Sequence, residues 1–169
     1  ALSEHQVDFG GATILPFDED KRQGCFQAGE PIIRAAGAWI ERGFIQGSNM
    51  FFSSKCLAKV GFFDARFGAG THYAGEDWDL AVRASLAGFT GAYLDGPIVY
   101  HDHGRDRSSR VERLRFYDYG AGAVYAKHLR SGNRRLALAA LHRDLLSINR
   151  RRKLDLARGF FAFSLRRHG

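Results

Sequence analysis

The stretch AGEDWDLAVRASLAG, residues 74–88, carries the sharpest local pattern in the chain. Its apolar residues recur at the spacing of one helix face, which predicts a helix over 77–86 that ends at Gly88. Three carboxylates stand at the start of this helix, on Glu76, Asp77 and Asp79. The helix dipole stabilises acidic residues in a first turn, so the cluster alone indicates only a well-formed helix start.

On the N-terminal side of this helix the pattern predicts strands, one short helix and a connector. The predicted elements are strands at 7–15 and within 44–53, a helix at 54–60, and a short helix or irregular connector at 32–42. Gly10 and Gly11 lie inside the first strand, where paired glycines indicate a bulge or a close approach of another backbone.

On the C-terminal side, the sequence predicts two strands and then helices only. The predicted strands are 90–94 and 98–101, joined by a turn at Asp95-Gly96-Pro97, and the predicted helices are about 111–129, 134–148 and 154–165. The expected fold class is therefore α/β, a mixed sheet followed by a helical C-terminal tail. We expect one part over 1–104 and a basic helical part over 105–169 that packs on it.

Composition narrows the class of protein. A chain of 169 residues that is 45% hydrophobic can form one domain with a substantial core. Its two cysteines, Cys25 and Cys56, have neither the spacing of a zinc finger nor that of a disulfide framework. The first residues lack the pattern of a signal peptide, and no apolar run has the length of a membrane span. We therefore expect a cytoplasmic location.

Charge is distributed unevenly along the chain. Residues 1–103 hold 8 Lys and Arg against 13 Asp and Glu, a net charge of −5, whereas 104–169 hold 17 against 5, a net charge of +12. The basic run 150–153, followed by leucines and phenylalanines, predicts a cationic amphipathic tail that lies on an anionic membrane surface. The alternative is that these apolar residues pack on the helix 134–148. Nucleic-acid binding is disfavoured, because no recognised fold signature accompanies the charge.

Four motifs occur in a defined order along the chain. They are Gly47-Ser48-Asn49-Met50-Phe51-Phe52-Ser53, Val60-Gly61-Phe62-Phe63-Asp64, Gly75-Glu76-Asp77-Trp78-Asp79-Leu80 and Val99-Tyr100-His101. In this order and spacing, residues 7–130 resemble the second half of family-2 glycosyltransferases, which have the GT-A fold. The resemblance implies transfer of a sugar from a nucleoside diphosphate sugar, with a UDP-sugar favoured, to a glycan or lipid-linked acceptor at the membrane periphery. A catalytically silent nucleotide-sugar or glycan-binding protein is the alternative.

The resemblance also implies roles for the acidic residues. Asp77 matches the general base of inverting members, and Glu76 would contact or orient the acceptor. Such a base is needed because an alcohol that attacks the anomeric carbon must lose its proton as the nucleotide leaves from the opposite face. Asp79 is placed among the substrate-binding residues, although a structural role, as a helix cap or as the partner of Arg83 four residues on, is the favoured interpretation.

Further residues are implied to bind substrate. Gly47, Ser48 and Asn49 would lie on the floor of the cleft, with a plain strand-entry turn as the alternative. Trp78 could stack on the acceptor, as could Trp39, but core packing is the favoured interpretation of Trp78.

The resemblance finally implies a divalent metal. His101 matches a histidine that helps to hold Mn²⁺ or Mg²⁺ on the diphosphate, and His103 is close enough to exchange roles with it. A solvent-facing or hydrogen-bonded histidine is the alternative. The nucleotide-binding strand and the acidic metal motif of the family would lie upstream of Ala1, so we expect that this chain alone does not complete a donor site.

Overall fold

The computed structural model describes residues 7–17, 30–102 and 110–166. They form a four-stranded mixed sheet and five helices, the last three of which make a C-terminal helical region, so the predicted fold class is confirmed. The chain divides into two compact units. The first unit is Ala1–Phe62 with Leu80–Gly104, and the second is Phe63–Asp79 with Arg105–Gly169.

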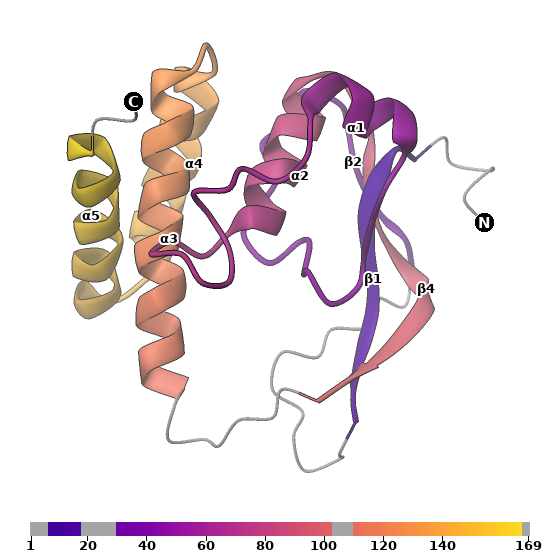
Figure 1. The fold of residues 1–169 in the computed structure, drawn as a ribbon, viewed down its shortest axis with the longest axis horizontal. Coiled ribbons are helices and arrows are strands. Elements are labelled where there is room, and N and C mark those ends of the chain that lie inside the picture. The colour runs from indigo at the N-terminus through magenta and orange to yellow at the C-terminus, as the bar shows by residue number, and fades with distance from the viewer. Residues whose placement is uncertain (1–6, 18–29, 103–109, 167–169) are drawn as a thin grey trace. The chain divides into compact units, whose positions relative to one another are not determined.

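The sheet belongs to the first unit. Its strands are β1 (Phe9–Pro16), β2 (Ile32–Arg34), β3 (Met50–Phe52) and β4 (Gly91–His101), in the order β2-β4-β1-β3. β1 and β4 run parallel and lie side by side in Figure 1, whereas β2 and β3 pair antiparallel at the edges. β2 falls in the region that was predicted as a short helix or connector, and the chain after it is irregular.

Glycine lets β1 lie at the centre of this sheet. A Cβ atom on Gly10 would lie 2.0 Å from the carbonyl oxygen of Ala92, far inside any normal contact. A Cβ atom on Gly11 would meet the ring of Tyr93 at 3.2 Å. The predicted close approach of another backbone at this glycine pair is therefore confirmed. The irregularity in the ladder lies one step further on, between Ala12 and Ile14.

The prediction of two strands joined by a turn at 95–97 is wrong. β4 continues as one strand from Gly91 to His101, and β1 pairs with it on both sides of this region. The side-chain amide of Asn49 donates to the carbonyl oxygens of Thr13 and Pro97, each at 2.9 Å. Pro97 has no N–H to donate to the ladder, and the Asn49 amide links β1 to β4 at this point. The ladder then continues with a shifted register.

The helices before β4 begin and end much as predicted. α1 (Ser54–Val60) is capped by the hydroxyl of Ser53, which accepts from the backbone N–H of Cys56, and it ends at Gly61 with φ 77°. α2 (Glu76–Leu86) starts one residue before the predicted position. Its first turn belongs to the second unit, and its remaining residues belong to the first.

The second unit is built on three helices, α3 (Arg110–Arg130), α4 (Arg134–Ser147) and α5 (Arg150–Leu165). α3 and α5 lie side by side in Figure 1 and approach each other closely. A Cβ atom on Gly159 would lie 1.8 Å from the carbonyl oxygen of Tyr119, and one on Gly122 would lie 2.0 Å from that of Leu156. The two backbones therefore touch at glycines.

An ion pair with a buried carboxylate also joins these two helices. The guanidinium of Arg152 donates to both carboxylate oxygens of Asp118, at 2.7 and 2.9 Å, and Asp118 is fully buried. α5 begins four residues earlier than predicted because Asn149 caps it by accepting from the backbone N–H of Arg152. One arginine of the basic run, itself partly exposed, thus pairs with a buried carboxylate of the unit.

The contact between glycines in α3 and α5 generates a stability prediction. Gly159→Ala should lower the free energy of unfolding by about 2 kcal/mol, because the new methyl group would overlap the backbone at Tyr119. Gly132→Ala is the matched control, since a Cβ atom there would meet nothing within 4 Å. Urea denaturation followed by circular dichroism measures both variants. A Gly159→Ala protein as stable as the wild type would contradict the close approach.

Candidate functional site

Glu76 and Asp77 lie at the start of α2, in the second unit, and both are partly exposed. The carboxylate of Glu76 accepts from the backbone N–H of Gly75 at 3.1 Å, and that of Asp77 accepts from the backbone N–H of Trp78 at 2.7 Å. These bonds satisfy N–H groups that a helix start leaves without an internal partner. They also fix one oxygen of each carboxylate at the beginning of the helix.

The loop before α2, residues 68–75, contains three glycines, and we call it the glycine-rich loop. It is closed by its own hydrogen bonds. The hydroxyl of Thr71 lies 2.9 Å from the carbonyl oxygen of Gly68 and accepts from the backbone N–H of Tyr73 at 3.1 Å. The backbone N–H of Gly68 donates to the carbonyl oxygen of Tyr73 at 2.8 Å. Gly68 and Gly75 have φ values of 106° and 105°, which glycine adopts without steric cost. The loop therefore reaches Glu76 through backbone turns that other residues disfavour.

Trp78 and Asp79 occupy the interior of the second unit. The Trp78 ring is 5% exposed and packs edge-on against Tyr125, with ring centroids 5.2 Å apart, as in the core-packing interpretation. Asp79 is fully buried and binds Lys127 Nζ at 2.7 Å and His128 Nε2 at 3.0 Å. The sequence had instead suggested a partner four residues along the same helix.

Arg83 is the residue that the sequence suggested as the partner of Asp79. Its guanidinium makes hydrogen bonds within the first unit. It donates to the backbone carbonyl oxygens of Val60, the last residue of α1, and of Phe62, two residues further on. Arg83 therefore holds the end of α1 against α2.

A chain of charges continues from Asp79 to the surface of the second unit. Lys127 Nζ also binds Asp64 at 2.8 Å, and Asp64 in turn accepts from the guanidinium of Arg66. We call Arg66, Asp64, Lys127, Asp79 and His128 the lysine network. Its members come from the connector 63–67 before the glycine-rich loop, from the first turn of α2 and from the end of α3.

The lysine network keeps its carboxylates ionised. Hydrogen bonds from Arg66 and then from Lys127 hold the pKa of Asp64 well below its usual range, against the effect of burial. Burial by itself would raise the pKa of Asp79, but the hydrogen bond to His128 and the ammonium of Lys127 lower it below its ordinary value. Asp79 is thus a buried, paired anion, whereas Asp77, two residues earlier, is partly exposed.

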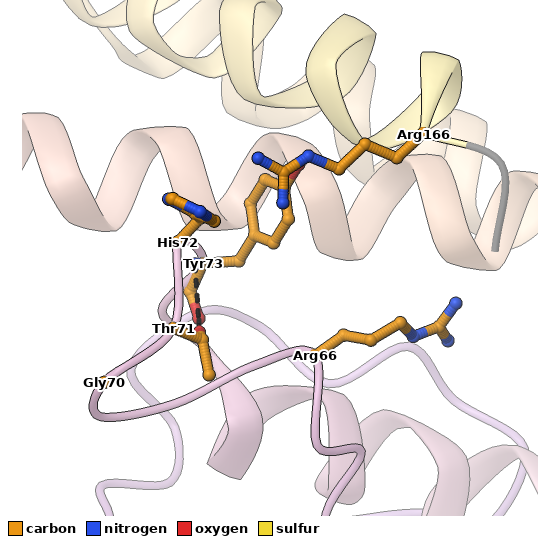
Figure 2. Close-up of a pocket in the computed structure, with 6 residues that line it drawn as sticks. All are labelled: Arg66, Gly70, Thr71, His72, Tyr73 and Arg166. Carbon is orange, nitrogen blue, oxygen red and sulfur yellow. Dashed lines mark hydrogen bonds between the residues drawn. The ribbon is translucent and has the colours of Figure 1, made fainter.

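A pocket of about 300 Å³ opens beside the glycine-rich loop in the second unit. Its lining residues are Arg66, Gly70, Thr71, His72, Tyr73 and Arg166 (Figure 2). The guanidinium of Arg166 lies over the ring of Tyr73, 5.6 Å from the centroid. Arg166 makes the lining suitable for an anionic group, whereas the guanidinium of Arg66 is already paired with Asp64. Five of these residues lie within 66–73, whereas Arg166 comes from the end of the helical region, so the sequence alone did not bring them together.

The remaining predicted residues lie in the first unit. Gly47, Ser48 and Asn49 form the turn that enters β3, and the side chain of Asn49 is committed to the two carbonyl oxygens already described. His101 is the last residue of β4, is partly exposed and pairs with Pro16 in the ladder. His103 lies outside the described residues.

A metal site around His101 does not assemble from the described residues. Nowhere in 7–17, 30–102 and 110–166 do three His, Cys, Asp or Glu side chains gather in a way that could hold an ion. Mn²⁺ and Mg²⁺ in proteins prefer several oxygen ligands, so His101 by itself does not make such a site. The part of the chain that the structure describes also contains no helix long and apolar enough to span a bilayer.

The lysine network generates a second prediction. Lys127→Met should lower the free energy of unfolding at pH 7 by about 3 kcal/mol, because it leaves the buried carboxylate of Asp79 with less compensation. Lys153→Met, which removes an exposed lysine of α5, is the control and should change stability by less than about 1 kcal/mol. Equal effects of the two substitutions would contradict the network.

The free energy of unfolding of Lys127→Met and of its control Lys153→Met should also depend on pH. Because the pKa values of Asp64 and Asp79 are lowered on folding, their contribution is complete above about pH 4 and is lost as the pH falls toward the folded values. Lys127→Met should reduce this loss in acid. Urea midpoints measured between neutral and acid pH would show it.

Comparisons with known proteins give one partial match. No protein-family model matches the chain, and no solved structure matches it significantly. A stretch of 70 residues, 41% of this chain, is 30% identical to a chondroitin synthase from Escherichia coli. The match covers 10% of that protein, so the chain spans only about a tenth of this relative's length.

Proposed function

We propose that the chain is the acceptor-side part of a glycosyltransferase similar to family 2, in which Asp77 is the general base. The observation that carries the proposal is the contrast within Glu76-Asp77-Trp78-Asp79, where the first two carboxylates are partly exposed and the last is buried and paired. The motif order supports it, and so does the partial likeness to a chondroitin synthase, which suggests a glycosyltransferase.

The geometry at the start of α2 suits a base. One oxygen of Asp77 accepts from the backbone N–H of Trp78, which orients the carboxylate. The lysine network holds Asp79 in the same helical turn, so the backbone that carries Asp77 is fixed from the interior. A carboxylate held in this way can take the proton of an acceptor hydroxyl with little loss of orientational freedom.

In the proposed reaction, the acceptor oxygen attacks the anomeric carbon of a nucleoside diphosphate sugar, for which a UDP-sugar is favoured. The bond from that carbon to the diphosphate breaks on the opposite face, so the configuration inverts, and the hydroxyl proton passes to Asp77. Glu76, whose carboxylate accepts from the backbone of the adjoining loop, orients the acceptor.

The acceptor would lie against the glycine-rich loop. The pocket beside that loop is lined by Arg166, whose guanidinium suits a phosphate or carboxylate, and by Arg66, whose guanidinium is shared with Asp64. A lipid-phosphate-linked glycan would offer such a group, which favours it among acceptors.

Asp77→Asn tests the proposal in the natural full-length protein. Transfer should fall by roughly 10²–10⁴-fold, the usual contribution of a general base, while donor binding and the unfolding midpoint stay close to wild type. Nucleoside diphosphate release in a coupled assay measures transfer. Glu112→Gln, which changes an exposed acid in the first turn of α3, is the control and should leave transfer unchanged.

Two outcomes would contradict this proposal. If Asp77→Asn turned over at the wild-type rate, Asp77 would not be the base. If the wild-type protein bound nucleotide sugar or glycan without any turnover, the catalytically silent binding protein would replace the enzyme.

We also propose that the enzyme binds Mn²⁺ or Mg²⁺. His101 would supply one ligand, and the others would come from outside the described residues. His101→Ala should weaken Mn²⁺-dependent binding of nucleotide to the full-length protein more than His103→Ala does. Nucleotide titrations with and without Mn²⁺ compare the variants. Small and equal effects of the two substitutions would show that His101 does not help to bind the metal.

A further inference from the structure

α5 has two different faces. Leu156 and Phe163 are 2% and 1% exposed and lie on the face that packs within the second unit, together with Gly159. Leu154, Phe161 and Leu165 are 52%, 62% and 81% exposed. Their spacing of seven and then four residues places them on one face of the helix, so three large apolar side chains form a line on its outer side.

The flanks of this line are positively charged. Arg150, Arg151, Lys153 and Arg158 are exposed on α5. The acidic residue of this helix, Asp155, has a side chain only 8% exposed, and it lies 3.3 Å from Arg158 and 3.4 Å from Arg115. The outer side of α5 therefore presents apolar groups and cations and no exposed carboxylate.

This arrangement divides the apolar residues of the basic tail between two environments. The packing alternative placed the apolar residues of this tail against the helix 134–148. Leu156 and Phe163 are indeed buried, but the helix that α5 packs on is α3. Leu154, Phe161 and Leu165 are left outside. Arg152 is also removed from the surface set, because it is paired with Asp118.

We propose that the outer face of α5, defined by Leu154, Phe161, Leu165 and the flanking arginines, binds an anionic lipid surface. The helix lies in the plane of the interface, with its apolar line between lipid headgroups and its guanidinium groups on lipid phosphates. Charge complementarity identifies the occupant: cations beside an acid-free apolar line fit anionic headgroups over acyl chains. A polynucleotide would use the cations and leave the leucines in water.

Flotation of the intact protein with vesicles tests the proposal, and its readout is independent of turnover. The wild type should bind phosphatidylserine-containing vesicles at low salt, bind less as salt rises, and bind pure phosphatidylcholine vesicles weakly. Arg150→Glu with Arg151→Glu should reduce binding by about tenfold or more. Phe161→Gln with Leu165→Gln should reduce it to a similar degree.

α4 supplies matched controls within the same unit. Arg134→Glu with Arg135→Glu reverses two exposed arginines that also open a helix, and Leu138→Gln with Leu146→Gln changes two leucines that are 50% and 73% exposed. Both control pairs should keep wild-type binding. Circular dichroism checks that every variant folds.

Each other outcome overturns the proposal. Equal losses from the α4 pairs would show attraction by overall charge. Loss from the charge reversals alone would show that the apolar line does not insert. Failure of the wild type to bind anionic vesicles at low salt, or binding to DNA in place of vesicles, would assign this face to another partner.

Discussion

The ammonium group of Lys127 lies between the carboxylates of Asp64 and Asp79, and the start of α2 depends on it. A buried carboxylate is costly unless it is paired, and Asp79 is fully buried. Lys127 and His128 supply that pairing from neighbouring positions on α3, and Asp64 extends it to the connector before the glycine-rich loop. One cluster of charges thus fixes three segments of the second unit.

This constraint gives neighbouring carboxylates different chemical roles. Asp79 is paired on both oxygens and holds the helix in place, while Asp77 keeps access to solvent at the same helical turn. A base must reach its substrate, and it works best when its backbone does not move. Arg66 lines the pocket and belongs to the same connector as Asp64. The pocket proposed to bind the acceptor and the carboxylate proposed to activate it are therefore both held by the lysine network.

Features that depend on local chemistry were predicted from the sequence, and features that depend on distant partners were not. The Ser53 cap and Gly61 define α1, and the close approach at Gly10 follows from its missing side chain. The continuation of β4 through Pro97 depends on Asn49, 48 residues away, and the partner of Asp79 is 48 residues away on α3. Spacing alone favoured a turn and a local ion pair.

We propose that the carboxylates at the start of α2 serve an acceptor in glycosyl transfer. Acceptor-dependent release of nucleoside diphosphate from a nucleotide sugar, measured with the natural full-length protein, tests it most directly. Release should require both sugar donor and acceptor and should depend on the Asp77 carboxylate. Release that proceeds equally without an acceptor, or that is indifferent to the loss of that carboxylate, would contradict it.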